Sequence, residues 1–277
     1  MDFTINYRKI MDDSYPLHWS FDYNHGAQNP EFAQELIKLL HGYDTKSTTH
    51  HTDAEEDHSI KHVYRILPNF WRGYQRRNAQ EDTLSIGNAI IERQKRNDDI
   101  WNYNVRYQNT TSGEDLQFEF RCQDECYRPL HGSWRVDAQN SCSDTYSRLT
   151  WDGYLTSGAE VVLRLNGSEI TAGTVDNSLP LTCNWALFDV IPALAEKMKE
   201  SGDDIGIALL DDLEQFRPKN RLGFLDSTQS PISLDGYYLY GTGILPSYWW
   251  VDVKGNIALV SSVFETLVLK EKMECPA

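Results

Sequence analysis

Between residues 99 and 176 the chain alternates apolar and polar residues, and this pattern limits the fold more than any other feature of the sequence. In DIWNYNVRYQ, Trp101, Tyr103 and Val105 fall on one side of an extended chain, with polar residues between them. DLQFEFRC repeats the pattern with Phe118 and Phe120. Because successive side chains of a β-strand point to opposite faces, a period of two predicts strands with one buried face.

Short turns separate many of the predicted strands. NTTSGED joins the first two alternating runs, and Asn166-Gly167 lies between EVVLRL and SEITAGTV. Asn-Gly is the strongest short hairpin signal, because both residues readily adopt the positive φ of a tight turn. About ten strands result, a number that tends to curl into a barrel or a sandwich. The further predicted strands are IKHVYRIL, HGSWRVDA, DIGIALL, YYLYG, SYWWVDV, IALVSS and FETLVLKE.

Two segments are harder to assign. TLSIGNAIIERQK is compatible with a bulged strand or a helix, because Gly87 interrupts its apolar run. LEQFRPKNRLGFLDSTQSP is rich in polar residues and is predicted to be a long connector.

Two helices are predicted. Asn29-Pro30 provides a cap and a first-turn proline for the helix PEFAQELIKLLHGY near the N-terminus. A longer helix is predicted near 183–201, where Trp185, Phe188 and Ile191 fall close to helical spacing. Pro192 would kink this helix or begin a second one.

We therefore predict a mainly β fold, an antiparallel meander curled into a barrel-like (lipocalin-like) or strongly curved sheet. No change in composition divides the chain, so residues 1–277 are predicted to form a single domain. Residues 1–59 would form a helical and loop region packed on the sheet. Residues 60–277 would form the β core with the helix insertion.

The net charge of −15 limits the partners. Phosphate groups would be repelled, which argues against nucleic acid and anionic membranes. No apolar run approaches the roughly 20 residues of a spanning helix, and the start of the chain does not resemble a signal peptide. Five cysteines, an odd number, are then expected to be reduced thiols in a cytoplasmic protein. None of these features excludes a homo-oligomer.

The stretch HHTDAEEDHSIKH contains four histidines and suggests a metal site. His62 lies inside a predicted strand, where it would stand about 13 Å from His58 at roughly 3.3 Å per residue. The HExxH pattern is absent. We therefore predict an acidic connector without a metal. No phosphate-binding glycine motif is present, so no cofactor is expected.

Four residues are candidate acids or bases. Asp189 is flanked by apolar residues, which could raise its pKa, and His62 could point into the sheet's interior. Glu119 lies opposite Phe118 and Phe120, and alternation alone does not decide which of the two faces encloses a cavity. The candidate catalytic residues are Glu119, Asp189, Asp252 and His62.

Aromatic residues are the main candidates for ligand contacts. They gather in GYYLYGTGILPSYWWVDV and in the strand that begins near residue 100. In a barrel, one face of these strands could stack on a flat or apolar ligand. The candidate ligand-binding residues are Arg121, Tyr238, Tyr240, Trp249, Trp250, Trp101 and Tyr103.

These features predict a β-barrel-type protein that binds a small organic molecule and acts as a cofactor-free acid/base enzyme. The reaction would be an isomerisation, a cyclisation, or the addition or removal of water (a lyase-type reaction), which need a shaped pocket and one or two tuned side chains. A carrier without catalysis is the first alternative. A metal-dependent enzyme that uses the His-rich 50–62 segment is the second.

Overall fold

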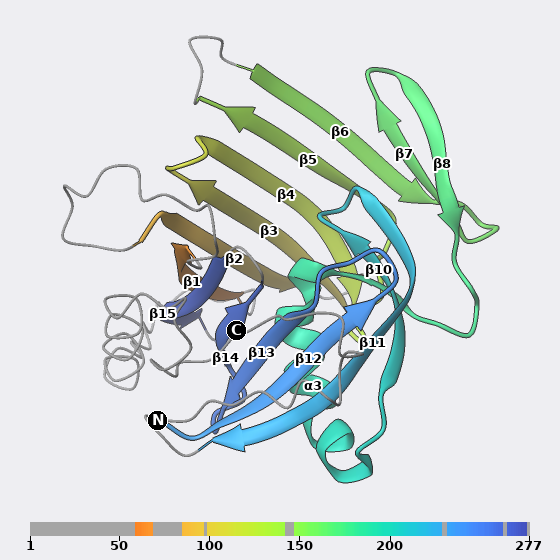
Figure 1. The fold of residues 1–277 in the computed structure, drawn as a ribbon. Helices are drawn as coiled ribbons and strands as arrows, with labels where there is room; N and C mark the ends of the chain where they lie inside the picture. Colours follow the sequence, from red (N-terminus) through yellow and green to blue (C-terminus); the bar gives the residue numbers. More distant parts are fainter. Residues whose placement is uncertain are drawn as a thin grey trace.

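The computed structural model describes residues 59–68, 85–96, 99–141, 147–228, 232–262 and 265–275. Within them, fifteen strands form one sheet, in the order β8-β7-β6-β5-β4-β3-β2-β1-β15-β14-β13-β12-β11-β10-β9 (Figure 1). The strands are β1 (Ser59–Pro68), β2 (Gly87–Arg96), β3 (Ile100–Asn109), β4 (Glu114–Gln123), β5 (Ser133–Asn140), β6 (Ser147–Leu155), β7 (Glu160–Leu165), β8 (Ser168–Thr174), β9 (Leu181–Cys183), β10 (Ile205–Asp211), β11 (Gln215–Thr228), β12 (Leu234–Gly241), β13 (Ser247–Asp252), β14 (Ile257–Ser261) and β15 (Glu265–Cys275).

The predicted antiparallel meander is confirmed. Neighbouring strands are antiparallel throughout, except that β9 runs parallel to β10. The sheet is strongly curved and its ladder is not closed, so β8 and β9 are its two edges. Leu130 lies between β4 and β9: it forms a bridge with Cys122, and its N–H donates to the carbonyl of Leu181 at 2.9 Å. These backbone contacts link the two sides of the curved sheet.

The aromatic face of the strands points inward. Tyr103, Val105 and Phe118 are buried, whereas Asn104 and Glu119 between them are exposed. Apolar burial drives this choice, because a second apolar surface is available on the inner side of the sheet. The following helix supplies that surface.

The predicted helix near 183–201 is confirmed as a short 3-10 turn, η2 (Asn184–Ala186), followed by α3 (Leu187–Ser201). Pro192 lies inside a continuous helix and does not begin a second one. Gly202, with a φ of 66°, ends the helix in the left-handed conformation that glycine tolerates best. In Figure 1, α3 lies between the β2–β6 part and the β10–β13 part of the sheet.

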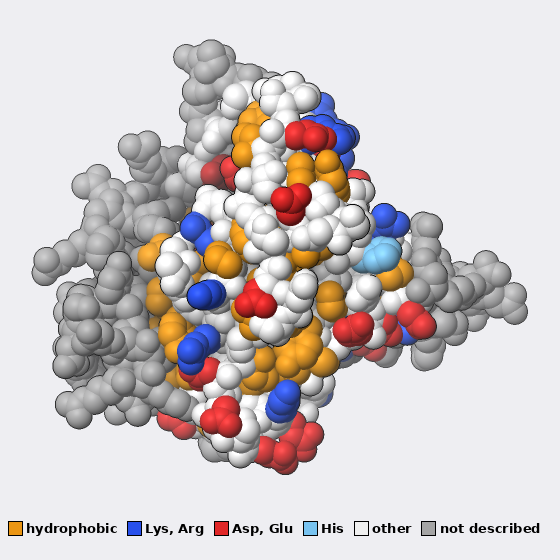
Figure 2. All heavy atoms as spheres, turned by 90° about the vertical axis from the view of Figure 1, so that its right-hand side faces the viewer, with side chains coloured by type: hydrophobic (Ala, Val, Ile, Leu, Met, Phe, Trp, Pro, Cys, Tyr) orange, Lys and Arg blue, Asp and Glu red, His pale blue; other side chains and the backbone are white. Residues whose placement is uncertain are grey.

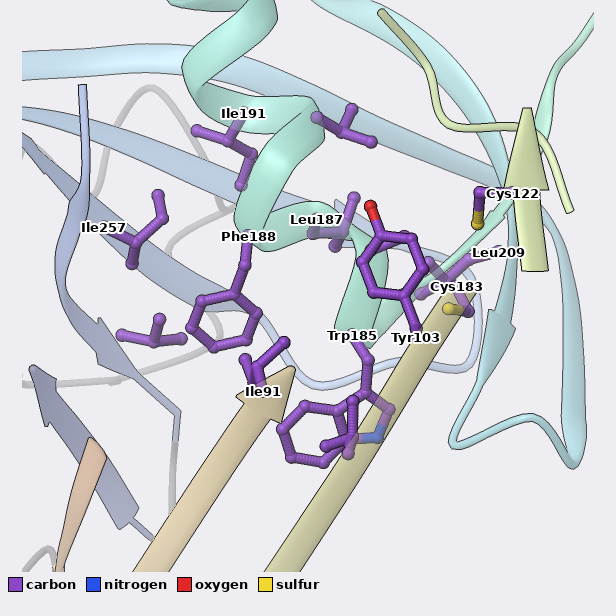
Figure 3. Close-up of a cluster of buried hydrophobic side chains, with 14 of the residues drawn as sticks. Ile91, Tyr103, Cys122, Cys183, Trp185, Leu187, Phe188, Ile191, Leu209 and Ile257 are labelled. Carbon is purple, nitrogen blue, oxygen red and sulfur yellow. The ribbon is translucent and has the colours of Figure 1, made fainter. Parts of the chain in front are cut away.

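Aromatic rings connect the helix to both parts of the sheet. Phe188 is centred 4.9 Å from Tyr64 of β1 and 5.0 Å from Trp249 of β13, and it stacks on Trp185 at 6.2 Å. Figure 3 shows Phe188 and Trp185 next to each other at the start of the helix. Each such buried ring is worth roughly 1.5–3 kcal/mol in transfer free energy, so this cluster is a centre of the core.

The predicted connector LEQFRPKNRLGFLDSTQSP is wrong, because residues 215–228 form β11. Lys219, Arg221 and Asp226 are exposed, while Leu222 and the polar Asn220 are buried on the inward face. Pro218 coincides with a register shift opposite Ile207–Leu209, where a missing N–H is tolerated. The segment TLSIGNAIIERQK, for which strand and helix were both open, contains the strand β2. The strand β6 was not predicted from the sequence.

The predicted N-terminal helix lies outside the described residues, as do His50, His51 and His58. Among the described residues, no helix is long and apolar enough to span a bilayer.

Candidate functional site

A cavity of about 510 Å³ opens at one end of the curved sheet, and we call it the mouth cavity. Trp185 and Phe188 from the start of the helix form its floor, with Trp249 of β13 beside them. Strands β3, β4, β10–β12, β14 and β15 provide the remaining wall. The complete lining is Tyr107, Glu114, Leu116, Asn184, Trp185, Phe188, Leu209, Asp211, Asp212, Arg217, Leu239, Gly243, Ile244, Leu245, Ser247, Trp249, Val260, Ser262, Glu265 and Leu267.

Carboxylates are concentrated around this cavity. Glu114, Asp211, Asp212 and Glu265 line it together with a single cationic side chain, Arg217. Burial raises the pKa of Asp211 to about 6, and the neighbouring Asp212 adds to the effect while Arg217 opposes it. The pKa of Asp212, which is exposed at the cavity, is also raised, chiefly by partial loss of hydration. Perturbed carboxyl groups of this kind are characteristic of functional sites.

Glu265, the first residue of β15, has a raised pKa for the same reason. Burial raises its pKa to about 7, and the repulsion from Asp212 and Glu114 contributes. Tyr107 Oη donates to Glu265 Oε2 at 2.7 Å, and this hydrogen bond lowers the pKa of Glu265 but does not cancel the rise. The Nδ2 of Asn109 in turn donates to Tyr107 Oη at 3.3 Å. Glu265 can therefore gain or lose a proton near neutral pH.

Asp212 is fixed at the cavity by the turn between β10 and β11. Asp212 and Leu213 have φ values of 47° and 55°, which are unusual for residues other than glycine. Asn184 holds this turn from two sides: its Nδ2 donates to Asp212 Oδ1 at 2.7 Å, and its Oδ1 accepts the Asp212 N–H at 2.9 Å. Trp134 Nε1 donates to the carbonyl of Leu213 at 3.0 Å. The carboxylate position is therefore built into the fold.

Replacing Asn184 with alanine is expected to lower the free energy of unfolding by about 1–2 kcal/mol, because two hydrogen bonds to the strained turn are lost. Chemical denaturation measures the change. Asn104→Ala serves as the control, since Asn104 is exposed on the outward face and should cost less than about 0.5 kcal/mol. Equal costs for the two variants would show that the turn does not depend on Asn184.

Two of the predicted catalytic residues meet elsewhere, in a buried cluster of four side chains that we call the helix anchor: His62, Arg93, Tyr103 and Asp189. Arg93 Nε lies 2.8 Å from Asp189 Oδ2, and Tyr103 Oη donates to the same oxygen at 2.7 Å. Arg93 Nη1 is 3.2 Å from His62 Nδ1. The cluster joins α3 to β1, β2 and β3, and none of its members lines the mouth cavity.

Electrostatics in the helix anchor keep His62 neutral. Burial lowers the pKa of His62 well below its usual value, and Arg93 and Lys272 lower it further. Because the Arg93 guanidinium can only donate, His62 Nδ1 must accept, and we assign the ring proton to Nε2. His62 therefore points into the interior. The cluster therefore attaches the helix to the sheet.

Glu119 and Arg121 lie on the outward face, away from the mouth cavity. With other polar and apolar side chains of β1–β7, and with Met273 of β15, they line a wide, open groove of about 1150 Å³. Asp252 is a turn residue: its Oδ1 accepts the backbone N–H groups of Lys254 at 2.9 Å and Asn256 at 2.7 Å.

The predicted ligand-binding residues also lie partly inside and partly outside the mouth cavity. Trp249 lines the mouth cavity, whereas Trp250 is buried but outside the main core cluster. Tyr238 and Tyr240 both donate to Asp204, at 2.6 and 3.0 Å. Trp101 is in the core, and its Nε1 donates to Asp124. Of the predicted ligand-binding residues, Trp249 alone belongs to the cavity.

Sequence reasoning missed Tyr107, Asp211, Asp212 and Glu265. A usable signal existed, because Asp211-Asp212 directly follows the apolar run IALL and Glu265 directly precedes TLVL. Charged residues at the ends of apolar strands are placed at the rim of a curved sheet.

No group of three or more His, Cys, Asp or Glu side chains in the described part of the chain is arranged to hold a metal ion. The His-rich segment falls mostly outside that part.

Comparison with known proteins gives little guidance. No family model and no curated protein matches the chain. Among solved structures, the chain is similar to a β-barrel-like protein of domain of unknown function DUF1849 from Brucella abortus. That similarity has a TM-score of 0.49 and 10% identity, over 79% of this chain and 98% of the other. A dehydratase domain from the CurF module of curacin polyketide synthase matches with a TM-score of 0.13 and 11% identity, over 88% and 84% of the two chains. At these levels neither similarity assigns a function.

Proposed function

We propose that this protein binds a small organic molecule in the mouth cavity. The observation that supports this most strongly is the combination of an aromatic floor, Trp185, Phe188 and Trp249, with a few fixed polar groups above it. Ligand sites usually have a volume of about 300–1,000 Å³ and this mixture of apolar walls and positioned polar groups. The cavity volume of about 510 Å³ lies within that range.

A variant that fills the cavity tests the proposal. Leu245 lines the rim and is 48% exposed, so Leu245→Trp can add bulk there without disturbing the core. The neutral fluorescent probe N-phenyl-1-naphthylamine is expected to bind saturably to the wild-type protein and at least about tenfold more weakly to this variant, a loss of roughly 1.4 kcal/mol.

Val253→Trp is the matched control, because Val253 is 83% exposed and does not line the cavity. It should leave the affinity of the probe unchanged. Absence of saturable binding, or equal binding by both variants, would contradict the proposal.

Acid/base catalysis in the same cavity is a second candidate function. Glu265, with a pKa of about 7 and a hydrogen bond from Tyr107, is suited to transfer a proton at neutral pH. An isomerisation, a cyclisation, or the addition or removal of water would need no more than this. An all-apolar lining would instead have favoured a carrier.

Conversion of a bound compound distinguishes the two candidates. For an enzyme, the pH–rate profile should show an ionisation near 7 that Glu265→Gln abolishes, while Glu119→Gln on the outward face leaves it in place. For a carrier, the compound that binds is recovered unchanged from the wild-type protein.

A further inference from the structure

The carboxylates of the mouth cavity differ from those on the outward face of the sheet in how they are paired. On that face, carboxylates have cationic partners: Asp115 lies 2.7 Å from Arg106, and Asp137 lies 2.9 Å from Arg135. Figure 2 shows acidic, basic and apolar side chains interspersed over the surface it views. An acidic protein therefore neutralises many of its surface carboxylates locally.

In the cavity, the hydrogen-bond partners are neutral. Asp212 accepts from the Asn184 amide at 2.7 Å, and Glu265 accepts from the Tyr107 hydroxyl at 2.7 Å. Glu114 accepts from the hydroxyl of Ser112 at 2.7 Å.

No lysine or arginine among the described residues forms an ion pair with a cavity carboxylate. Arg217, the cation in the lining, donates to the Gln215 side chain, and its charge lowers the pKa of Asp211 without cancelling the rise. The charge of the cavity carboxylates is therefore compensated only in part by the described residues, through Arg217 near Asp211.

The floor of the cavity is suited to an organic cation. Trp185 is 6% exposed, and its indole N–H is buried. The indole lies close enough to Asp212 to lower the pKa of that carboxyl group. Trp185 and Phe188 stack with an interplanar angle of 9°, and Trp249 is close to perpendicular to Phe188 at 73°. Aromatic faces attract cations through their quadrupole, and this attraction grows when water is excluded.

We propose that the ligand of the mouth cavity is a small organic cation, an aromatic or apolar ammonium compound whose charge lies between Asp212 and Glu265 and whose apolar part packs on Trp185 and Phe188. This inference rests on the proposed function. It adds the charge of the ligand, which cavity shape alone does not define.

Proton release is a consequence of this arrangement. The charged groups that line the cavity are Glu114, Asp211, Asp212, Glu265 and Arg217. A bound ammonium group favours the ionised form of Glu265, whose pKa is about 7 in the empty cavity. Near pH 7, binding should therefore release about half a proton from Glu265, and affinity should increase as the pH rises through 7.

Three probes of nearly equal size test the inference by isothermal titration calorimetry: phenethylammonium, phenethyl alcohol and phenylacetate. We expect the ammonium compound to bind at least about tenfold more tightly than the alcohol, and the carboxylate most weakly. Titration in two buffers of different ionisation enthalpy should detect the released proton for the ammonium compound alone.

Charge-removing variants give the decisive comparison. Asp212→Asn and Glu265→Gln should each reduce the preference for the ammonium compound over the alcohol by about five- to tenfold, whereas Glu119→Gln should leave it unchanged. Equal affinity for the three probes, or an unaltered preference in both cavity variants, would overturn the inference. The neutral naphthylamine probe decides the proposed function separately: if it binds while the ammonium compound does not, binding stands and the cationic ligand is wrong.

Discussion

Replacing Asp189 with asparagine is expected to lower the free energy of unfolding by about 3–5 kcal/mol, the largest effect that we predict for any single substitution. The reason is Arg93, which is 2% exposed and whose Nε lies 2.8 Å from Asp189 Oδ2. Removing the carboxylate charge leaves this buried guanidinium without a counter-ion. Tyr103 also loses its charged acceptor. Urea denaturation of the two proteins measures the difference.

Three comparisons separate the lost ion pair from general damage to the helix. Glu196→Gln changes an exposed carboxylate of the same helix and should cost less than about 0.5 kcal/mol. Tyr103→Phe should cost about 1.5–3 kcal/mol, because a single hydrogen bond to a charged acceptor is lost. Arg93→Met combined with Asp189→Leu should be more stable than Asp189→Asn alone, since no unpaired charge stays buried. If Asp189→Asn costs no more than Tyr103→Phe, the charge pair does not hold the helix.

The helix anchor and the mouth cavity are adjacent in the chain as well as in space. Asp189 follows Phe188 directly, so one residue of α3 fixes the helix to β2 and β3 while its neighbour forms the cavity floor. Packed interiors transmit displacements because they contain few voids. A weakened anchor should therefore also reduce affinity in the cavity, although no anchor residue lines it.

Much of the fold follows from local patterns. The alternation in 99–123 gives β3 and β4, and Asn166-Gly167 forms the predicted hairpin turn with φ values of 52° and 80°. In these segments each residue's environment is set mainly by its strand neighbours. The alternation of apolar and polar residues and the residues of the turn are therefore sufficient to predict the strands. β11 was missed because a strand whose outward face is polar and interrupted by Pro218 has the composition of a loop.

The site was less accessible from sequence. Alternation separates Glu119 from Phe120, but the choice of inward face depends on α3, which lies far away in the chain. Asp189 and His62 were singled out from local context, and both are in the interior, yet their distance from Glu265 depends on the curvature of the whole sheet. The cavity joins the ends of β3, β10 and β15, and no local signal records that three such distant strand ends converge.

Glu265→Gln is expected to make the protein more resistant to unfolding at alkaline pH, by about 2 kcal/mol relative to wild type once partial solvent screening is allowed for. Burial raises the pKa of Glu265 from 4.5 to about 7. Between these values the folded protein keeps a proton that the unfolded chain has released, so the free energy of unfolding of the wild type falls as the pH rises through this window.

Glutamine has no charge to bury and can still accept the hydrogen bond from Tyr107, so the variant escapes the contribution of Glu265 to this loss. The causes of the raised pKa of Asp211 do not include Glu265, so its effect cancels when wild type and variant are compared at each pH. Asp212 repels Glu265, so relief of this repulsion is part of the expected difference. Guanidinium denaturation from about pH 4 to pH 9 should show a difference that is small at the acid end and levels off above about pH 7. Glu119→Gln, on the exposed outward face, should give a difference that is flat with pH. A flat difference for Glu265→Gln as well would mean that Glu265 ionises in the folded protein as it does in the unfolded chain. The proton release expected on binding of a cation would then have no source in this residue.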